Sequence, residues 1–368
     1  MKDIETSRKE IEEADAQMAL LFAKRMKAAA EIAEYKKERG LAIRDTTRES
    51  VLLEKNRAYI EDPAIESYYV RFLEETISLS CDYQEELNEG MKTAYCGVEG
   101  AFAYIAAKKM FPTSRLISCP DFSKAYSGVE KGLYDCAVLP LENSYAGEVG
   151  NVMDLIFSGE LFINRVMELP VRHCLIAKKG ARIENIKKVI SHPQALSQCA
   201  DYIKAHGFET ESAANTAAAA KHLAECDDMT MAAIASEDTA EIFGLTCLEC
   251  GINDASNNTT RFASVSRKQN VPRAAKLREN ENFILVFTVQ NKAGALAQTL
   301  NIIGAHGYNM RSLQSHPLKG LQWNYYFYIE AEGNVHNENG KAMLQELSAI
   351  CARLKLVGTF ISEDNNEL

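Results

Sequence analysis

The sequence lacks the features that would place it in several common protein classes. Its 368 residues contain no run of eighteen apolar residues, so no membrane-spanning helix is expected. The N-terminus, MKDIETSRKE, is charged from its start and shows no apolar secretory segment, so we expect a cytoplasmic protein. A formal net charge of -10 argues against a nucleic-acid partner, which would bind a basic patch.

Signals for a metal or a nucleotide cofactor are also missing. The seven histidines show no metal-ligand spacing, and no glycine-rich phosphate loop occurs. The ten cysteines are scattered singly except for Cys247 and Cys250, and one C-x-x-C without a second pair is a weak zinc signal. We therefore expect reduced, mostly buried thiols, no metal and no cofactor.

Helices dominate the first part of the chain. Residues 1–88 contain one glycine and one proline, and apolar residues recur at helical spacing over 4–36, which predicts a long amphipathic helix. Thr46 and Glu49 match a capping box that would open a second helix, and Pro63 would precede a third.

Cations fall at unusual positions on the first helix. At about 100° per residue, Arg25 and Lys36 lie within the apolar stripe and Arg8 lies at its edge. Two interpretations stay open. The cations hold an anionic ligand, or they extend to solvent at the edge of a helical bundle while Glu49 is only a helix cap.

The pattern changes in residues 92–267, where short β-like runs alternate with helical ones. This alternation predicts an α/β domain with a largely parallel sheet and enough length for two lobes. Ligands in such folds bind beyond the ends of strands. The candidate walls of a cleft are PLENSYAGEVG, SHPQALSQC and NNTTRF, the last standing before the strand-like ASVS, although turn chemistry alone could explain all of them.

A charged linker containing Pro272 leads to a third region, residues 283–361. Its runs follow the order βαββαβ, which is typical of a ferredoxin-like domain. It shows no catalytic cluster, so we expect a role in binding or assembly.

Taken together, the residues resemble one known family over nearly the whole chain. Residues 1–88 resemble all-helical chorismate mutases, 92–267 resemble prephenate dehydratases and 283–361 resemble an ACT domain. The specific signals are TRF at 260–262, PLENS at 140–144 and GALAQTL at 294–300. The resemblance is to the bifunctional chorismate mutase/prephenate dehydratases, and it implies a helical bundle, a two-lobed α/β domain and a ferredoxin-like ACT domain.

The resemblance implies that the helical region turns chorismate into prephenate by a pericyclic rearrangement. Such a reaction needs no nucleophile, because clamping both substrate carboxylates fixes the reactive conformer. Lys36 and Gln84 would face the departing ether oxygen. The residues implied to bind or brace the substrate are Arg8, Arg25, Asp45, Arg48, Glu49 and Ser80. Arg8 would act across a homodimer or a dimer of dimers, because in this family the first helix completes a neighbouring site.

The α/β region would remove CO2 and water from prephenate to give phenylpyruvate. Aromatisation drives the loss, and Thr260 would donate a hydrogen bond to the departing hydroxyl. Threonine is too weak an acid to act alone, so neighbours must assist. The other implied residues are Asn143, Ser144, Ser191 and Gln198 lining the site, Glu142 as a relay or brace, and Arg261 and Phe262 flanking the cleft.

The third region would bind phenylalanine as a feedback inhibitor. The implied binding residues are Gly294, Ala295, Leu296, Asn309, Gln314 and Ser315. This chain departs from the family at Val98, where proline is usual, and at Gln314–Pro317, which replaces the family's ESRP and so loses a carboxylate and a guanidinium.

Two other functions are compatible with the same pattern. The α/β and ACT regions could form a module that senses an amino acid without catalysis, since a fold does not establish activity. Alternatively, a dehydratase could carry a mutase bundle used only for dimerisation.

Overall fold

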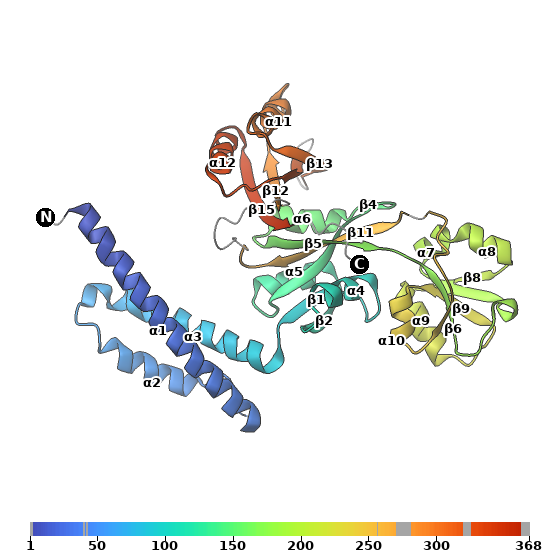
Figure 1. The fold of residues 1–368 in the computed structure, drawn as a ribbon, viewed down its shortest axis with the longest axis horizontal. Helices are drawn as coiled ribbons and strands as arrows, with labels where there is room; N and C mark the ends of the chain where they lie inside the picture. The colour runs from blue at the N-terminus through green and yellow to red at the C-terminus, as the bar shows by residue number, and fades with distance from the viewer. Residues whose placement is uncertain are drawn as a thin grey trace. The chain divides into compact units, whose positions relative to one another are not determined.

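The computed structural model describes residues 3–39, 41, 43–255, 257–269, 281–318 and 325–361. The chain divides into two compact units, Met1–Lys92 and Thr93–Leu368. Figure 1 shows the helical first unit in blue and the sheets of the second unit in green to red. None of the helices in these ranges is long and apolar enough to cross a membrane.

The first unit consists of α1 (Ile4–Arg39), α2 (Thr46–Arg57) and α3 (Pro63–Glu89). Both α1 and α2 pack against α3. The predicted capping box is wrong by one residue, because Asp45 is the N-cap of α2 and its carboxylate accepts the backbone N–H of Arg48 at 3.0 Å. A carboxylate accepts such a bond more strongly than a hydroxyl and also favours the positive helix end.

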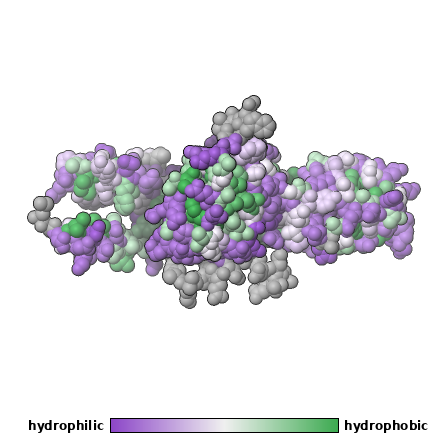
Figure 2. All heavy atoms as spheres, turned by 90° about the horizontal axis from the view of Figure 1, so that it is seen from above, coloured by the Kyte–Doolittle hydropathy of each residue, from purple (hydrophilic) through white to green (hydrophobic). Residues whose placement is uncertain are grey.

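The core of this unit is small. On α1 only Ala29 and Ala33 are buried, and the buried cluster of this unit consists of Leu73, Ile77 and Cys81 of α3. The large apolar residues of α1 that remain exposed are Ile4, Ile11, Met18, Leu20, Leu21, Phe22, Ile32 and Tyr35. Figure 2 shows apolar patches in green on the molecular surface. A single copy therefore leaves most of the predicted apolar stripe of α1 uncovered.

The second unit contains two α/β lobes. Lobe 1 comprises β1 (Lys92–Cys96), α4 (Phe102–Met110), β2 (Arg115–Cys119), α5 (Phe122–Glu130), β3 (Cys136–Asn143), β4 (Gly147–Glu148), α6 (Gly150–Ser158), β5 (Phe162–Pro170) and β11 (Thr259–Ser266). Lobe 2 comprises β6 (Cys174–Ala177), η1 (Ile183–Asn185), β7 (Lys188–Ser191), α7 (Pro193–Gln198), α8 (Ala200–His206), β8 (Glu209–Ser212), α9 (Thr216–Glu225), β9 (Met231–Ala235), α10 (Glu237–Ile242) and β10 (Thr246–Cys250).

Both sheets are mixed, so the expectation of a largely parallel sheet is wrong. The chain leaves lobe 1 through β5 and returns through β11, and β11 pairs antiparallel with both β5 and β3. In lobe 2, β6 pairs antiparallel with β9 and with β10, whereas β7 pairs parallel with β8 and β9. Thr259 and Thr260 are the first residues of β11, so this part of NNTTRF is strand and not the predicted loop.

The C-terminal segment follows the order βαββαβ, with β12 (Glu281–Thr288), α11 (Ala295–Ala305), β13 (Asn309–Pro317), β14 (Tyr325–Glu332), α12 (Glu338–Ile350) and β15 (Arg353–Ile361). Its strands stand in the order β13-β14-β12-β15, and β15 pairs parallel with β5 of lobe 1 at Gly358 and Ile163. The C-terminal segment therefore extends the sheet of lobe 1 in the part of the chain that the structure describes.

The junction between these sheets predicts a stability effect. A Cβ at Gly358 would clash with the backbone of Ile163, which has little freedom to move inside a buried sheet. We expect Gly358→Ala to destabilise the second unit by about 1–3 kcal/mol, measured as a lower Tm in thermal unfolding. Gly304→Ala in α11 is the control, because no atom lies within 4 Å of its added Cβ. An unchanged Tm for Gly358→Ala would contradict the close packing at this junction.

Candidate active sites

The first unit contains a pocket that receives side chains from all three of its helices. Of the residues predicted for the mutase, it brings together Arg25, Lys36, Asp45, Arg48, Glu49, Ser80 and Gln84. Arg25 and Lys36 reach the same pocket because eleven residues make about three helical turns. The arrangement accounts for cations within an apolar stripe.

Arg25 is held in this pocket by two oxygen atoms of α3. Its Nη1 donates to the carbonyl oxygen of Thr76 at 3.0 Å and to the hydroxyl oxygen of Ser80. Burial lowers the pKa of Arg25 from its ordinary value. No carboxylate pairs with Arg25 among the described residues, and a partly buried guanidinium without a counter-ion favours an anionic ligand.

Lys36 and Gln84 are held by backbone carbonyls. Lys36 Nζ donates to the carbonyl of Ile43, and Gln84 Nε2 donates to the carbonyl of Ser80 at 3.1 Å. The Oε1 atom of Gln84 is buried and has no partner within the described ranges. Since the Nε2 group carries two hydrogens and only one is used here, it can still donate to a ligand.

Arg8 does not line this pocket within its own chain. Its side chain is 63% exposed and pairs with Glu5 at 2.7 Å. The pocket has three cations, Arg25, Lys36 and Arg48, and two carboxylates, Asp45 and Glu49, so its formal charge is +1. The pocket would balance both negative charges of a dicarboxylate only if one further cation joined it.

The second unit contains a cleft where its two lobes meet. Three of the predicted dehydratase residues line it: Asn143 from the end of β3, Gln198 from α7 and Thr260 from β11. The connection from β5 to β6 contributes Val171 and His173. The cleft therefore lies where the chain passes from one lobe to the other.

Asn143 fixes the hydroxyl of Thr260. Its Oδ1 accepts the backbone N–H groups of Tyr145 and Ala146 at 3.0 and 2.8 Å, and these groups can only donate. The amide nitrogen must then face the other way, where it donates to Thr260 Oγ1 at 2.9 Å and to Asn258 Oδ1 at 2.8 Å. Because Thr260 Oγ1 accepts from Asn143, its own hydrogen is free for a ligand in the cleft.

The loop after β3 is built for this geometry. The turn at Asn143 is closed by its own side chain, and Gly147 at φ +78° lets the chain reverse into β4. Ser144 braces the facing strand, since its hydroxyl accepts the N–H of Thr259 at 2.9 Å and donates to the carbonyl of Asn257 at 2.8 Å. Ser144 thus holds the loop without lining the cleft.

Among the cleft residues that were not predicted from the sequence, two have unpartnered polar atoms. His173 and Asn258 are buried, and the Nδ1 of His173 and the Nδ2 of Asn258 have no partner in the part of the chain described. Burial lowers the pKa of His173, whose Nε2 lies 2.9 Å from Gln198 Oε1. Asn258 was in the quoted NNTTRF stretch, whereas no spacing signal marks His173.

Neither lysine nor arginine is among the described residues that line the cleft. Instead, the N-termini of α4 and α9 contribute Ala101, Phe102, Asn215 and Thr216 to its wall. The N-cap of α4, Ala101, has no side-chain cap, which leaves backbone N–H groups of the first turn for other acceptors. Helix N-termini carry partial positive charge and bind anions.

Several predicted residues lie outside the cleft. Ser191 is buried, and its hydroxyl donates to the carbonyl of Ile234 at 2.6 Å, so it joins β7 to β9. Phe262 is buried in a hydrophobic cluster and does not flank the cleft as expected. The alternation of side chains along β11 places Thr260 and Phe262 on the same face, and Phe262 lies deeper in the core.

Arg261 points to the opposite face of β11, toward the C-terminal segment. It forms ion pairs with Glu142 at 2.8 Å and with both oxygens of Glu330 at 3.0 and 2.8 Å. Gln314 Nε2 donates to Glu142 at 3.2 Å. Burial alone would lower the pKa of Arg261, but these carboxylates raise it above its ordinary value. We call these four residues the Arg261 cluster.

A second cavity lies beside the Arg261 cluster. It is lined by Asn143 and Thr260 of lobe 1 and by His316 and Pro317 of β13. The Nε2 of His316 lies 2.8 Å from Glu148. Two side chains of the Thr260 site thus face the C-terminal segment as well as the cleft.

The residues predicted to bind phenylalanine are spread along the C-terminal segment. Gly294 is the N-cap of α11 with φ +80°, and Ala295 and Leu296 begin that helix. Asn309 starts β13 and donates to Glu332 at 2.9 Å, whereas Gln314 belongs to the Arg261 cluster and Ser315 is exposed near the end of β13. Val98 lies exposed in the loop that follows β1.

The expectation that all cysteines are free thiols is wrong. Cys174 and Cys250 form a disulfide, because β6 and β10 pair antiparallel with these two residues opposite each other. The other eight cysteines are free.

Comparison with known families gives two matches. A family model described as chorismate mutase type II matches residues 7–85, and one described as prephenate dehydratase matches residues 93–270. The boundary between the matches falls at the boundary between the two compact units.

Individual relatives cover the same regions. A bifunctional chorismate mutase/prephenate dehydratase from Buchnera aphidicola is 30% identical over 98% of this chain and 97% of its own length. An arogenate dehydratase/prephenate dehydratase from Arabidopsis thaliana is 34% identical over 73% of this chain and 72% of its own. The crystal structure of a prephenate dehydratase in complex with L-Phe, from Arthrobacter aurescens, is 28% identical with a TM-score of 0.67, covering 74% of this chain and 90% of that one.

Proposed function

Since this chain belongs to the bifunctional chorismate mutase/prephenate dehydratase family, we propose that the helical pocket rearranges chorismate and that the cleft of the second unit dehydrates prephenate. The first product is then the second substrate. The observation that carries the second assignment is the orientation of Asn143, which leaves the hydroxyl hydrogen of Thr260 for the leaving group.

In the helical pocket, side-chain cations hold the substrate in its reactive conformer. Arg25 and Arg48 bind the two carboxylates of chorismate, while Asp45, Glu49 and Ser80 bind its hydroxyl or brace the cations. Lys36 and Gln84 donate to the ether oxygen, on which charge develops as the C–O bond breaks and the C–C bond forms. The electrons redistribute within the substrate, so no group of the protein is oxidised or reduced.

A second copy of the chain would complete this pocket. The exposed apolar stripe of α1 needs a cover, and the pocket is one positive charge short of a dicarboxylate. Arg8 of another copy supplies that charge if the long α1 helices pair. A homodimer, alone or as half of a dimer of dimers, satisfies both requirements with one symmetric contact.

In the cleft, loss of CO2 supplies the electrons that make the ring aromatic. The bond to the carboxylate breaks, a ring double bond forms, and the ring hydroxyl leaves and takes up a proton to become water. Thr260 donates a hydrogen bond to the departing oxygen, and this bond stabilises the charge that develops there. The net proton comes from solvent that reaches the cleft, since threonine itself is too weak an acid.

Prephenate is a dianion, and the cleft binds it without lysine or arginine among its described lining residues. The N-termini of α4 and α9 supply the complementary partial charges. His173 and Asn258 offer unpartnered polar atoms at fixed positions, and Gln198 orients the His173 ring. Ser144, Ser191 and Phe262 support the walls.

Phenylalanine regulates the dehydratase through the C-terminal segment, which we assign as an ACT domain. The βαββαβ order supports the assignment, and the proposed binding residues are Gly294, Ala295, Leu296, Asn309, Gln314 and Ser315. The Arg261 cluster is the route to catalysis, because Arg261 follows Thr260 and Glu142 precedes Asn143.

Replacement of Thr260 tests the dehydratase assignment. We expect Thr260→Val to lower dehydratase kcat roughly 10²–10³-fold, because the hydroxyl is lost while the shape is kept. The measurement is phenylpyruvate formation from prephenate at neutral pH. Thr259→Val is the matched control, and Thr260→Ser should restore most of the rate. A parental rate in a folded Thr260→Val protein would end the proposed role.

Replacement of Arg25 tests the mutase assignment. We expect Arg25→Ala to lower mutase kcat/KM by about 10²-fold or more with helix content unchanged, since alanine is a good helix former. Chorismate consumption followed by absorbance is the readout. Arg44→Ala is the control, because Arg44 is exposed and pairs with Asp82 at 3.7 Å. If Arg25→Ala keeps the parental mutase rate, the bundle serves assembly and not catalysis.

Calorimetry tests the regulatory assignment. Titration of the full chain with phenylalanine should give saturable heat at ligand concentrations up to about millimolar and should reduce dehydratase turnover at the same concentrations. Alanine is the ligand control, because it lacks the ring. Absence of heat with phenylalanine would leave the C-terminal segment as an assembly module.

A further inference from the structure

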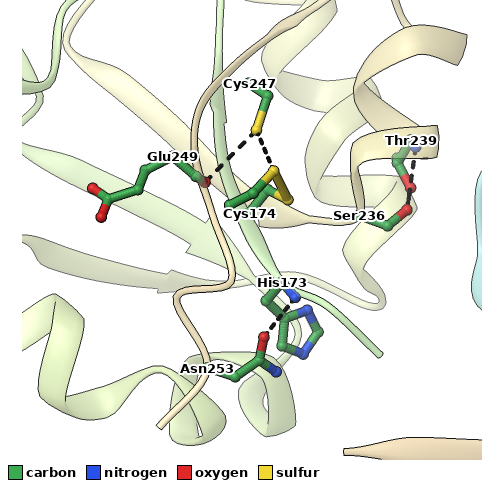
Figure 3. Close-up of a disulfide and its surroundings, with 8 residues drawn as sticks. His173, Cys174, Ser236, Thr239, Cys247, Glu249 and Asn253 are labelled. Carbon is green, nitrogen blue, oxygen red and sulfur yellow. Dashed lines mark hydrogen bonds between the residues drawn. A yellow bond between two sulfur atoms is a disulfide. The ribbon is translucent and has the colours of Figure 1, made fainter. Parts of the chain in front are cut away.

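Three cysteines meet at one end of lobe 2. Cys174 and Cys250 are disulfide-bonded, and the sulfur of Cys247 lies 2.8 Å from that of Cys250 (Figure 3). All three sulfur atoms lie within 4.8 Å of one another. Two sulfur atoms that are not bonded normally stay farther apart than this, so Cys247 is already in contact with the disulfide.

The backbone explains why Cys247 reaches the disulfide. Cys174 and Cys250 are opposite each other on β6 and β10, and the register of β10 shifts between Cys247 and Glu249. A bulge of this kind shortens and bends a strand. It brings Cys247 toward Cys250, although three residues of a regular strand would span about 10 Å.

The sulfur cluster is directly attached to the wall of the dehydratase cleft. Cys174 follows His173, which lines the cleft. The carbonyl of His173 accepts the N–H groups of Gly251 and Ile252 at 2.9 and 3.1 Å, and its own N–H donates to Asn253 Oδ1 at 2.7 Å. Residues 251–253 follow Cys250, so the position of His173 depends on how the end of β10 is held.

We propose that Cys174, Cys247 and Cys250 form a thiol–disulfide exchange site whose pairing sets the geometry of the dehydratase cleft. The thiolate of Cys247 attacks the sulfur of Cys250. A Cys247–Cys250 bond forms, the Cys174–Cys250 bond breaks, and Cys174 leaves as a thiolate that takes up the proton Cys247 had lost. No electrons are gained or lost in this step. A small dithiol can also reduce the disulfide, giving two electrons and two protons and becoming a disulfide itself.

Each pairing imposes a different shape on β10. A disulfide requires Cα atoms within about 7 Å, so a Cys247–Cys250 bond holds the end of β10 in a turn. The cross-strand Cys174–Cys250 bond instead holds Cys250 against β6. Exchange therefore shifts Gly251 and Ile252 and with them the carbonyl of His173.

Burial raises the pKa of Cys247, with a further contribution from Glu237, so thiolate is scarce and exchange is a slow modification.

Peptide mapping tests the pairing itself. The full-length protein is quenched in acid, alkylated without reduction and digested, and the disulfide-linked peptides are identified by mass spectrometry. We expect both Cys174–Cys250 and Cys247–Cys250 peptides. Cys247→Ser should leave the first alone and Cys174→Ser the second alone. Cys226→Ser in the same lobe is the matched control and should preserve both. Finding only Cys174–Cys250 in the unaltered protein would overturn exchange.

Turnover tests the link to the cleft, and this part rests on the proposed dehydratase function. We expect reduction with a phosphine to change dehydratase kcat/KM by about fivefold or more, while mutase turnover, which belongs to the other unit, stays constant. The double variant Cys247→Ser/Cys250→Ser should not respond to reduction, because Cys174 then has no sulfur partner left in the cluster. Mutase activity and circular dichroism confirm that this variant is folded.

The outcomes separate the two proposals. An equal dehydratase rate before and after reduction of the unaltered protein would overturn the link between sulfur pairing and cleft. Zinc retained by the reduced protein at one ion per chain, and released when the three cysteines are alkylated, would replace exchange by metal binding. If both disulfide pairings are found but the protein shows no dehydratase turnover before or after reduction, the proposed function is contradicted and the exchange site is not.

Discussion

The second unit depends on one amide group, that of Asn143. Two backbone N–H groups hold its oxygen, and this leaves its nitrogen to donate to Thr260. The direction of the threonine hydrogen follows from that choice, since an oxygen that accepts from a fixed donor presents its own hydrogen elsewhere. Asn143 and Thr260 are brought together by the pairing of β3 with β11, so the chemistry rests on strand register. The turn at Gly147 and the brace at Ser144 preserve that register.

Under the proposed function, the two sites hold doubly charged substrates by different means. The helical pocket uses guanidinium and ammonium groups, which can approach a carboxylate closely and fix its orientation. The cleft uses the N-termini of α4 and α9, whose positions are set by the fold and whose partial charges need no counter-ion. A pericyclic reaction benefits from a rigid clamp on one conformer. A reaction that expels CO2 benefits from weaker contacts with the carboxylate that is lost.

The C-terminal segment is joined to lobe 1 both by sheet and by charge. The strand pairing at Gly358 makes the sheet continuous, and the Arg261 cluster places a carboxylate of β14 against the strand that carries Thr260. Arg261 forms ion pairs with both Glu142 and Glu330. A movement of β14 away from β11 would therefore leave a buried charge unpaired. Gln314 and His316 of β13 also contact lobe 1, because Gln314 donates to Glu142 and His316 lies beside Glu148.

Local pattern was enough to identify the three regions, the long first helix and two cations of the helical pocket, because helical spacing brings Arg25 and Lys36 to one face. The other residues expected in that pocket came from the family resemblance. Local pattern also singled out PLENS and NNTTRF. It could not decide which strands pair antiparallel, which side of β11 each residue faces, or that His173 and Asn258 meet Thr260. Local pattern also gave no sign that Cys174 meets Cys247 and Cys250. These residues lie more than seventy positions apart in the sequence, and the pairing of β6 with β10 brings them into contact. Spacing along the chain sets contacts within an element, whereas contacts between distant elements are set by strand register and packing, and only the tertiary structure decides those.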